Sequence, residues 1–568
     1  MKSYEYRAAA VQTLAKMGDV EANLKICAHY VKQAAQQNIR VIVFPECMNV
    51  GYLYNSQPHA RQIAETIKDG KFIHGLAKLA RQHDVYIASG LSEWDPEAEK
   101  IFNTGILLDR KGELVVHYHK QFLTTHDQNW FKFGERGFPV VETELGRVGM
   151  MICFDGRIPE IPRCTALKGA QVILDMANFF LIDQAELWRP ARALENGVWI
   201  CAATKAGQER SIYYPGGSMI VDPRGEVKAT VAWDIHGMAI SNIDPTLADD
   251  KHYALSSDKF TDRRPDTYGI LTKSYEETPV SKTSIEPIIP SEMTFNMAAA
   301  QTHVCESHPT TLDRVIEQVT HGARFGIKVM VLPEYVASPN WRIDEAEARR
   351  LAGMNQELLR KFGEVCKTEK CALLVPNVEE VGSKLYPTSF LLGLEGEIIM
   401  SYRKVHLFSD EQQWGTAGSE YPVVNTPYGR MGIMMGYDGL FPEAARCLGA
   451  NGADVILWPT RMQDEKERKY LLVPRAADNR CAVILANRVD APYGGGSMVA
   501  LPTQFPVWDV DKVAPNYPDM HKIVLEVVEI ASSRQKNMMA NVHMFAKRQP
   551  WTYSALTAQH KVVNVAGK

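Results

Sequence analysis

The chain has 568 residues, too many for one hydrophobic core, so its length predicts at least two large domains. Apolar residues make up 45% and charged residues 23%, and 63 basic residues nearly balance 67 acidic ones. This balance gives no strong field of one sign, so we expect neither nucleic acid nor a membrane as a partner. The first residues, MKSYEYRAAAVQT, contain no uninterrupted apolar stretch, which predicts neither signal peptide nor anchor and favours a cytoplasmic protein.

Ten cysteines are scattered along the chain without a repeated metal-type spacing. Even the close pair Cys366 and Cys371 has no further ligands nearby in the sequence. We therefore expect reduced thiols and no bound metal. The GxG patterns are isolated, and no phosphate-binding or dinucleotide-binding motif is present, so we also expect no cofactor.

Short apolar runs alternate with amphipathic stretches along the first half. Strands are predicted at AAAVQT (8–13), VIVF (41–44), VYIASG (85–90), GMMI (149–152) and QVILDMA (171–177). Helices are predicted at NLKICAHYVKQAAQQ (23–37) and around PARALEN (190–196). Strands this apolar need helices on both faces, so the pattern predicts an α/β fold.

The same order of motifs returns in the second half. MAAAQT corresponds to AAAVQT, PRAADN to PARALEN, and GGSM occurs in both halves. Near the end of each copy, DRRPDTY (262–268) resembles KRQPWTY (547–553). The segment between the copies is rich in Pro, Ser, Thr and Glu and predicts an extended linker at 274–291. We therefore expect one domain at 1–273 and another at 292–568.

Three motifs in the first copy carry candidate chemistry. VIVFPE ends on Glu46, YHKQFL carries Lys120, and GMMICFDGRIPE carries Cys153. Taken singly, each has an ordinary explanation, because a strand-end glutamate and a lysine are usually solvated and a lone cysteine is usually a small buried hydrophobe. Taken together, they supply the base, the cation and the thiol that nucleophilic catalysis requires.

The second copy repeats this set without its thiol. VMVLPE ends on Glu334, YRKVHLF carries Lys404, and GIMMGYDGLFPE has Gly436 in place of the cysteine. Glutamate and lysine are 74 residues apart in the first copy and 70 in the second, and the next steps are 33 and 32. Cys447 is no substitute, because it corresponds to Cys164. We expect one active site, and Gly436→Cys alone is not expected to create another, since glycine can adopt backbone angles closed to cysteine.

Other polar and aromatic residues near these motifs are expected to hold structure. Glu160, Arg192 and Asn196 follow Cys153 or lie on a predicted helix, where ion pairs, helix caps and packing are their expected roles. Tyr52 and most other aromatic residues near the motifs are expected in the core.

Glu46, Lys120 and Cys153, matched in order and spacing by the second copy, resemble the nitrilase superfamily of carbon–nitrogen hydrolases. The likeness covers nearly the whole chain. It implies a four-layer αββα sandwich for each half, with the two packed as an internal pseudo-dimer; whether these form a homo-oligomer stays open. It also implies that Cys153 is the nucleophile and Glu46 the general base. Lys120 and the backbone N–H of Phe154 would stabilise the oxyanion.

One position departs from the family pattern. Many members have a second glutamate three residues before an aromatic pair, and the first copy has Asp127 there. Aspartate is one methylene shorter, and a shift of about 1 Å can cost roughly two orders of magnitude in rate. Either the loop repositions Asp127, or His126 shares its work. The degenerate second site comprises Glu334, Lys404, Glu411 and Gly436. It either binds a ligand or is a relic whose charges pair with each other.

The residues after the cysteine bear on the substrate. Phe-Asp-Gly followed by Pro-Glu is similar to the amidase side of the superfamily, whereas nitrilases commonly have Trp-Glu. The resemblance thus implies that the substrate is a small linear, non-peptide amide, cleaved through a thioester with release of ammonia or an amine. An N-carbamoyl amine or a nitrile is an alternative substrate. A non-catalytic binding or scaffold protein is an alternative of another class, because the second copy lacks its cysteine.

Overall fold

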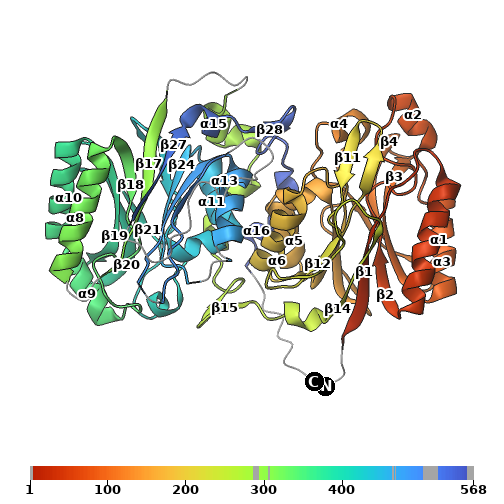
Figure 1. Cartoon of the computed structure of the whole chain (residues 1–568), viewed down its shortest axis with the longest axis horizontal. Helices are drawn as coiled ribbons and strands as arrows, with labels where there is room; N and C mark the ends of the chain where they lie inside the picture. Colours follow the sequence, from red (N-terminus) through yellow and green to blue (C-terminus); the bar gives the residue numbers. More distant parts are fainter. Residues whose placement is uncertain are drawn as a thin grey trace. The chain divides into compact units, whose positions relative to one another are not determined.

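The computed structural model describes residues 4–285, 293–304, 308–463, 466, 468–490, 492–502 and 522–559. The chain forms two compact units (Figure 1). The first unit comprises Met1–Lys251, Met539–Val542 and Lys547–Leu556, and the second comprises His252–Met538, His543–Ala546 and Thr557–Lys568. The units and the two sequence copies therefore do not contain all the same residues.

The first unit is built on two six-stranded sheets whose faces contact each other. One has the order β14-β1-β2-β3-β4-β5, with strands β1 (Tyr6–Gln12), β2 (Ile39–Val43), β3 (Tyr86–Asp95), β4 (Lys100–Leu108), β5 (Leu114–His119) and β14 (Gly237–Ile243). The other has the order β13-β12-β9-β8-β7-β6, with strands β6 (Val141–Thr143), β7 (Gly146–Ile152), β8 (Val172–Met176), β9 (Trp199–Ala203), β12 (Met219–Val221) and β13 (Val227–Thr230). A separate hairpin joins β10 (Ala206–Glu209) and β11 (Ile212–Pro215).

Helices cover the outer faces of both sheets and complete four layers (Figure 1). On the first sheet lie α1 (Val20–Gln36) and α3 (Lys71–His83), and on the second lie α5 (Glu160–Leu167) and α6 (Arg189–Asn196). Two shorter helices are α2 (Gln57–Ile63) and α4 (Asp127–Trp130). Helix α1 buries Cys27, Tyr30, Val31 and Ala34, the spacing of one helical face. The α/β prediction is confirmed, and the central strands are apolar because both of their faces are covered.

The second unit repeats these layers in the described part of the chain. Its first sheet has the order β21-β20-β19-β18-β17-β27, with β17 (Thr294–Gln301), β18 (Ile327–Val331), β19 (Ala372–Val381), β20 (Lys384–Leu392), β21 (Ile398–Arg403) and β27 (Lys522–Glu529). Its second has the order β22-β23-β24-β25-β26, with β22 (Val423–Thr426), β23 (Gly429–Ile433), β24 (Val455–Pro459), β25 (Ala482–Ala486) and β26 (Met498–Ala500). The covering helices are α8 (His308–Arg324), α9 (Glu345–Gly353), α10 (Asn355–Glu369), α11 (Pro442–Ala450) and α13 (Val473–Asn479).

Each unit includes a segment from the end of the sequence copy that forms most of the other unit. We call residues 252–273 the first arm, which belongs to the second unit, and residues 547–556 the second arm, which belongs to the first unit. Arg548 of the second arm forms a buried ion pair with Glu160, with a nitrogen–oxygen distance of 3.1 Å. Arg263 of the first arm pairs in the same way with Glu443, at 3.0 Å. The repeated motif thus marks equivalent contacts, one in each unit.

The described part of the segment between the copies is not extended. It contains a 3₁₀ turn at Tyr275–Glu277 and the short helix α7 (Val280–Thr283). The turn forms because Glu277 accepts a hydrogen bond from the Ser274 N–H at 2.9 Å, a reciprocal cap that replaces the extended conformation predicted from composition. Residues 286–291 of the predicted linker lie outside the described residues.

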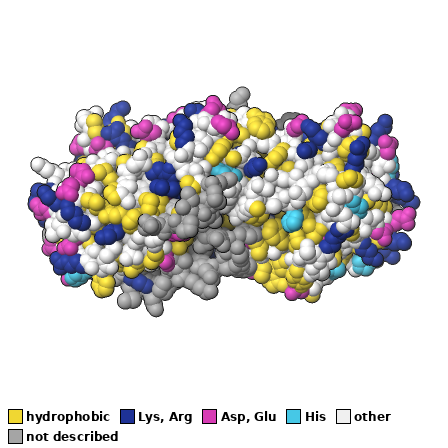
Figure 2. Space-filling model, turned by 90° about the horizontal axis from the view of Figure 1, so that it is seen from above, with side chains coloured by type: hydrophobic (Ala, Val, Ile, Leu, Met, Phe, Trp, Pro, Cys, Tyr) yellow, Lys and Arg dark blue, Asp and Glu magenta, His cyan; other side chains and the backbone are white. Residues whose placement is uncertain are grey.

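Surface and cysteines agree with an ordinary globular chain. On the face shown in Figure 2, basic and acidic side chains are interspersed. The nine cysteines in the described ranges are free thiols, all buried. None of the helices in those ranges is long and apolar enough to cross a membrane.

Candidate active site

Glu46, Lys120 and Asp127 meet in the interior of the first unit. Glu46 follows strand β2, Lys120 follows β5, and Asp127 begins helix α4. The Nζ atom of Lys120 lies 2.8 Å from Glu46 Oε1 and 2.8 Å from Asp127 Oδ2. All three side chains are buried. Burial alone would lower the pKa of Lys120, but the Asp127 and Glu46 carboxylates raise it well above its usual value, so the ammonium stays charged.

The Asp127 carboxylate reaches this lysine although its side chain is short. Its oxygens also accept hydrogen bonds from the Tyr52 hydroxyl at 2.9 Å and the Thr124 N–H at 2.9 Å, which hold it in place. The equivalent Glu411 of the second unit approaches its own lysine to the same 2.8 Å. His126 is exposed, so the geometry agrees with the first of the two alternatives, in which the loop repositions the aspartate.

Cys153 lies at the sharp turn that follows strand β7. It starts the 3₁₀ turn Cys153–Arg157 and has a φ angle of 51°, in the left-handed region that few side chains adopt. Its backbone N–H donates to Asp175 Oδ1 at 3.0 Å, and its carbonyl accepts from Arg189 Nη2 at 2.6 Å. Arg189 Nε also donates to Asp175 Oδ2 at 2.7 Å. The Asp175–Arg189 pair therefore holds both the N–H and the carbonyl of the strained residue.

A second carboxylate ties the cysteine turn to the segment that carries Lys120. Asp155, two residues after Cys153, accepts four hydrogen bonds. The donors are the N–H groups of Ile152 (3.0 Å), Gln121 (3.1 Å) and Phe122 (2.9 Å) and the hydroxyl of Tyr118 (2.7 Å). Because both segments share this carboxylate, the thiol and the ammonium have a defined relative position.

Burial raises the pKa of both the thiol and the neighbouring glutamate. Burial, followed by the negative charge of Glu46, raises the pKa of Cys153 to about 12, while Lys120 and Arg189 act in the opposite direction. Burial also raises the pKa of Glu46, and the nearby Lys120 offsets this only in part. Glu46 Oε1 accepts hydrogen bonds from Lys120 and, at 2.6 Å, from Asn103 Nδ2, whereas Oε2 has no hydrogen-bond partner among the described residues. Glu46 thus has a vacant acceptor site and an enhanced proton affinity, and the resting thiol is protonated.

Sequence reasoning missed three polar residues of this site. Asn103 bridges Glu46 and Asp127, with Nδ2 at 2.6 and 3.4 Å from their oxygens, and the Asp175–Arg189 pair supports Cys153. A signal for them was present in the repeat. The corresponding positions of the second copy, where the cysteine is lost, are Pro387, Trp458 and Leu472.

The second unit places Glu334, Lys404, Glu411 and Gly436 together. The Nζ atom of Lys404 lies 2.9 Å from Glu334 and 2.8 Å from Glu411. Gly436 has a φ angle of 48°, close to that of Cys153 and in the left-handed region that side chains rarely adopt, so a cysteine there would be strained. A steric obstacle adds to this, because a Cβ at Gly436 would lie 2.4 Å from Glu334 Oε2. Glu334 occupies the space that a thiol would need.

The charges of the second site pair with each other. Arg461, at the position of Asn178 in the first copy, lies 2.9 Å from Asp410 Oδ1, 3.3 Å from Glu411 Oε1 and 3.7 Å from Glu334 Oε2. Its guanidinium adds a second cation to a site that has glycine at the position of Cys153. A cavity of about 70 Å³ remains beside Gly436 and Trp458.

The four-layer sandwich, the buried acid–lysine pair and the strained cysteine turn together define a hydrolase of the nitrilase type. The Carbon-nitrogen hydrolase family model matches residues 7–253 and 296–504. The chain therefore belongs to the carbon–nitrogen hydrolase family, and it contains the family's domain twice.

Three relatives and neighbours each match a little under half of this chain. The chain is 31% identical over 262 residues to a nitrilase of Pyrococcus abyssi. The match covers 46% of this chain and 98% of that protein. It is 28% identical over 289 residues to the deaminated glutathione amidase of Mus musculus, covering 47% and 87%. Among solved structures, a branch 10 member of the nitrilase superfamily from Saccharomyces cerevisiae is 26% identical, with a TM-score of 0.40 and coverage of 43% and 92%.

Proposed function

We propose that the first unit hydrolyses the C–N bond of a small linear amide through a thioester on Cys153. The observation that carries this proposal is the meeting of a strained cysteine turn with a buried, ion-paired Glu46, Lys120 and Asp127. Support comes from relatives named as amidases, among them the omega-amidase of Saccharomyces cerevisiae, 27% identical over 282 residues.

Acylation begins with a neutral thiol, because the pKa of Cys153 is about 12. As Sγ attacks the carbonyl carbon, its proton passes to Glu46, whose raised pKa makes it a stronger base than an exposed carboxylate. The carbonyl oxygen gains negative charge, which the Lys120 ammonium and the Phe154 N–H stabilise. The C–N bond then breaks, Glu46 returns the proton to the leaving nitrogen, and ammonia or an amine departs.

Deacylation uses the same groups in reverse. Glu46 takes a proton from water, the resulting hydroxide attacks the thioester carbonyl, and the Lys120 ammonium and the Phe154 N–H stabilise the second oxyanion. The carbon–sulfur bond breaks, the thiol is reprotonated, and a carboxylic acid leaves. Asp127 acts through Lys120, whose ammonium it holds charged and in position, and so it is a positioning residue in this scheme.

The test combines a substrate screen with trapping of the intermediate. Ammonia release is measured over a panel of linear amides, ureido acids and nitriles, and active mixtures are quenched in acid for peptide mass mapping. We expect release from amides and an acyl adduct on the peptide that carries Cys153. Release from ureido acids or nitriles alone would replace the amide with one of those substrates.

The alternative class, a binding or scaffold protein, has its own outcome in this test. No ammonia from any compound, together with a folded protein by circular dichroism, would overturn the proposed hydrolase. An acyl adduct on a cysteine other than Cys153 would overturn the proposed nucleophile. A Cys164→Ala protein is the matched control, since Cys164 is a buried thiol outside the site.

A further inference from the structure

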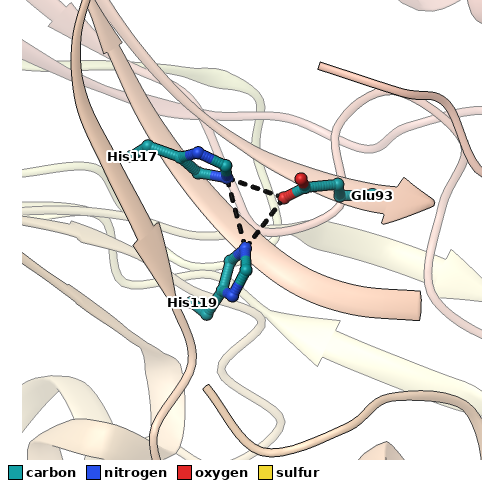
Figure 3. A group of neighbouring side chains, drawn as sticks. All are labelled: Glu93, His117 and His119. Carbon is teal, nitrogen blue, oxygen red and sulfur yellow. Dashed lines mark hydrogen bonds and ion pairs between the residues drawn. The ribbon is translucent and has the colours of Figure 1, made fainter. Parts of the chain in front are cut away.

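Three ligand-type side chains converge on the edge of the first sheet. Figure 3 shows Glu93 of strand β3 with His117 and His119 of strand β5, their polar atoms pointing toward one point. Glu93 Oε2 lies 2.8 Å from His117 Nε2 and 3.1 Å from His119 Nε2, and the two Nε2 atoms are 3.2 Å apart. The two histidines share a face because alternate residues of a strand point the same way. Sequence analysis, which predicted no metal, missed this arrangement.

The three distances form a triangle of the size that a metal ion requires. Bonds of about 2.0–2.2 Å to imidazole nitrogen and carboxylate oxygen place neighbouring ligand atoms roughly 3 Å apart. Two imidazoles and one carboxylate are a common ligand set for borderline divalent ions, with one or more positions left for water. Glu93 and His119 are buried, and His117 is partly exposed, which gives an ion a route of entry.

Hydrogen bonds among Glu93, His117 and His119 do not satisfy all the polar atoms that meet there. Glu93 Oε2 already accepts from Thr104 Oγ1 at 2.6 Å, so both histidines add donors to one crowded oxygen. Arg136 Nε donates to His119 Nε2 at 3.3 Å, which requires that nitrogen to be unprotonated. An unprotonated His119 Nε2 then faces the Glu93 oxygen without a proton between them. A cation at the centre removes this conflict, and Arg136 is exposed and can turn away.

The second copy shows what a plain ion pair looks like at this place. Strand register makes Glu379 the counterpart of Glu93, Thr388 of Thr104, and Arg403 of His119. Arg403 Nε lies 2.8 Å from Glu379 Oε2, and the counterpart of His117 is Ser401. One arginine therefore suffices to pair the glutamate, whereas the first copy has two imidazoles aimed at the same oxygen.

We propose that Glu93, His117 and His119 bind a divalent transition-metal ion of the zinc type. The ion joins strands β3 and β5, which lie on either side of β4, through side chains, one residue before Lys120 in the chain. His119 Nδ1 has no hydrogen-bond partner among the described residues. Because loss of such an outer partner typically weakens metal affinity about 10–100-fold, we expect an exchangeable ion.

The test measures metal binding by the full chain without an affinity tag. After treatment with a chelator, Zn²⁺ is titrated by calorimetry, and Co²⁺ binding is followed by its visible spectrum. The test variant is His117→Ser/His119→Arg, which copies the second unit. A matched variant, His29→Ser/His74→Arg, makes the same changes at two exposed histidines elsewhere in the unit. Melting temperatures with and without Zn²⁺ give a readout that does not depend on turnover.

We expect one Zn²⁺ per chain in the wild type and in the matched variant, with a rise in melting temperature. The His117→Ser/His119→Arg protein should bind at least tenfold more weakly and show no such rise, while it folds normally. A Glu93→Gln protein should also bind more weakly. Equal binding by the wild type and the His117→Ser/His119→Arg protein would overturn the proposal. A Co²⁺ spectrum with thiolate charge-transfer bands that persists in that variant would also overturn it, because it would assign the ion to cysteines.

Discussion

The first and second sites are built on the same buried scaffold and differ in what surrounds the turn. Both keep a glutamate, a lysine and a second acid in contact, with 2.8–2.9 Å between lysine nitrogen and carboxylate oxygen. They differ at three equivalent positions. Gly436, Trp458 and Arg461 of the second copy correspond to Cys153, Asp175 and Asn178 of the first. Every one of these differences touches the thiol or its support. The two sites therefore differ at the cysteine position and in the residues around it, and they share the charged scaffold.

The reason for this asymmetry is energetic. Removing one partner from a buried ion pair leaves an uncompensated charge and costs about 3–5 kcal/mol. Lys404 and its two glutamates thus contribute to a stable second unit whether or not they act on a substrate. Arg461 fits this view, because it adds charge pairing where no reacting group remains.

The largest expected effect belongs to the nucleophile. Cys153→Ala should reduce turnover below about a thousandth of wild type, because the second site has no thiol to replace it. Ammonia release measures this, and Cys447→Ala, a buried thiol of the second unit, is the matched control. Activity above that level would show that a second nucleophile exists. The two sites would then differ less than the presence of a cysteine in only one of them suggests.

The paired lysines separate catalysis from stability. Lys120→Met should destabilise the protein by about 3–5 kcal/mol, since it leaves two buried carboxylates without their cation. Lys404→Met should destabilise it less, since Arg461 still lies beside Glu334 and Glu411. Lys120→Met alone should also lower kcat by a factor of about 10²–10³, because it removes a cation at the oxyanion. Thermal melts and steady-state kinetics below the transition measure the two effects. An equal loss of kcat in both variants would mean that the second site contributes to the reaction.

Removal of the Asp175–Arg189 ion pair that supports Cys153 should have a smaller effect. Asp175→Asn keeps an acceptor for the Cys153 N–H but removes the charge that pairs with Arg189. We expect kcat to fall by roughly 10–100-fold with little change in KM, since a displaced nucleophile is the main consequence. The control is Trp458→Phe at the equivalent position of the second unit. A change in KM alone would assign Asp175 to substrate binding.

A cysteine introduced at Gly436 should not make the second site active. In a Cys153→Ala background, Gly436→Cys should restore no ammonia release and should destabilise the protein by about 1–3 kcal/mol through overpacking against Glu334. Gly436→Ala, which adds the same Cβ without sulfur, should destabilise it similarly. Restored turnover in the cysteine variant would show that Glu334 moves aside easily and that the missing thiol is the sole difference.

The repeat made the scaffold predictable, and particular contacts show where prediction stopped. Glu46, Lys120 and Cys153 follow apolar strands, and strand ends meet at one edge of a sheet, so sequence order was enough to bring them together. Asn103, Asp175 and Arg189 lie in strands or helices whose side-chain directions depend on register, which spacing alone does not define. The exchange of the two arms was also out of reach, because Arg263 and Arg548 occupy equivalent motif positions whichever unit they pack on.

That exchange has a consequence for synthesis of the protein. Arg548 follows its partner Glu160 by 388 residues, so the ribosome adds it roughly 20–80 s later at about 5–20 residues per second. During that interval Glu160 lacks this arginine. The first unit is thus translated first but completed late, and a chain that ends before residue 547 would contain Glu46, Lys120, Asp127 and Cys153 but would still lack the Arg548 guanidinium. Completion of the first unit is in this way tied to translation of the second copy.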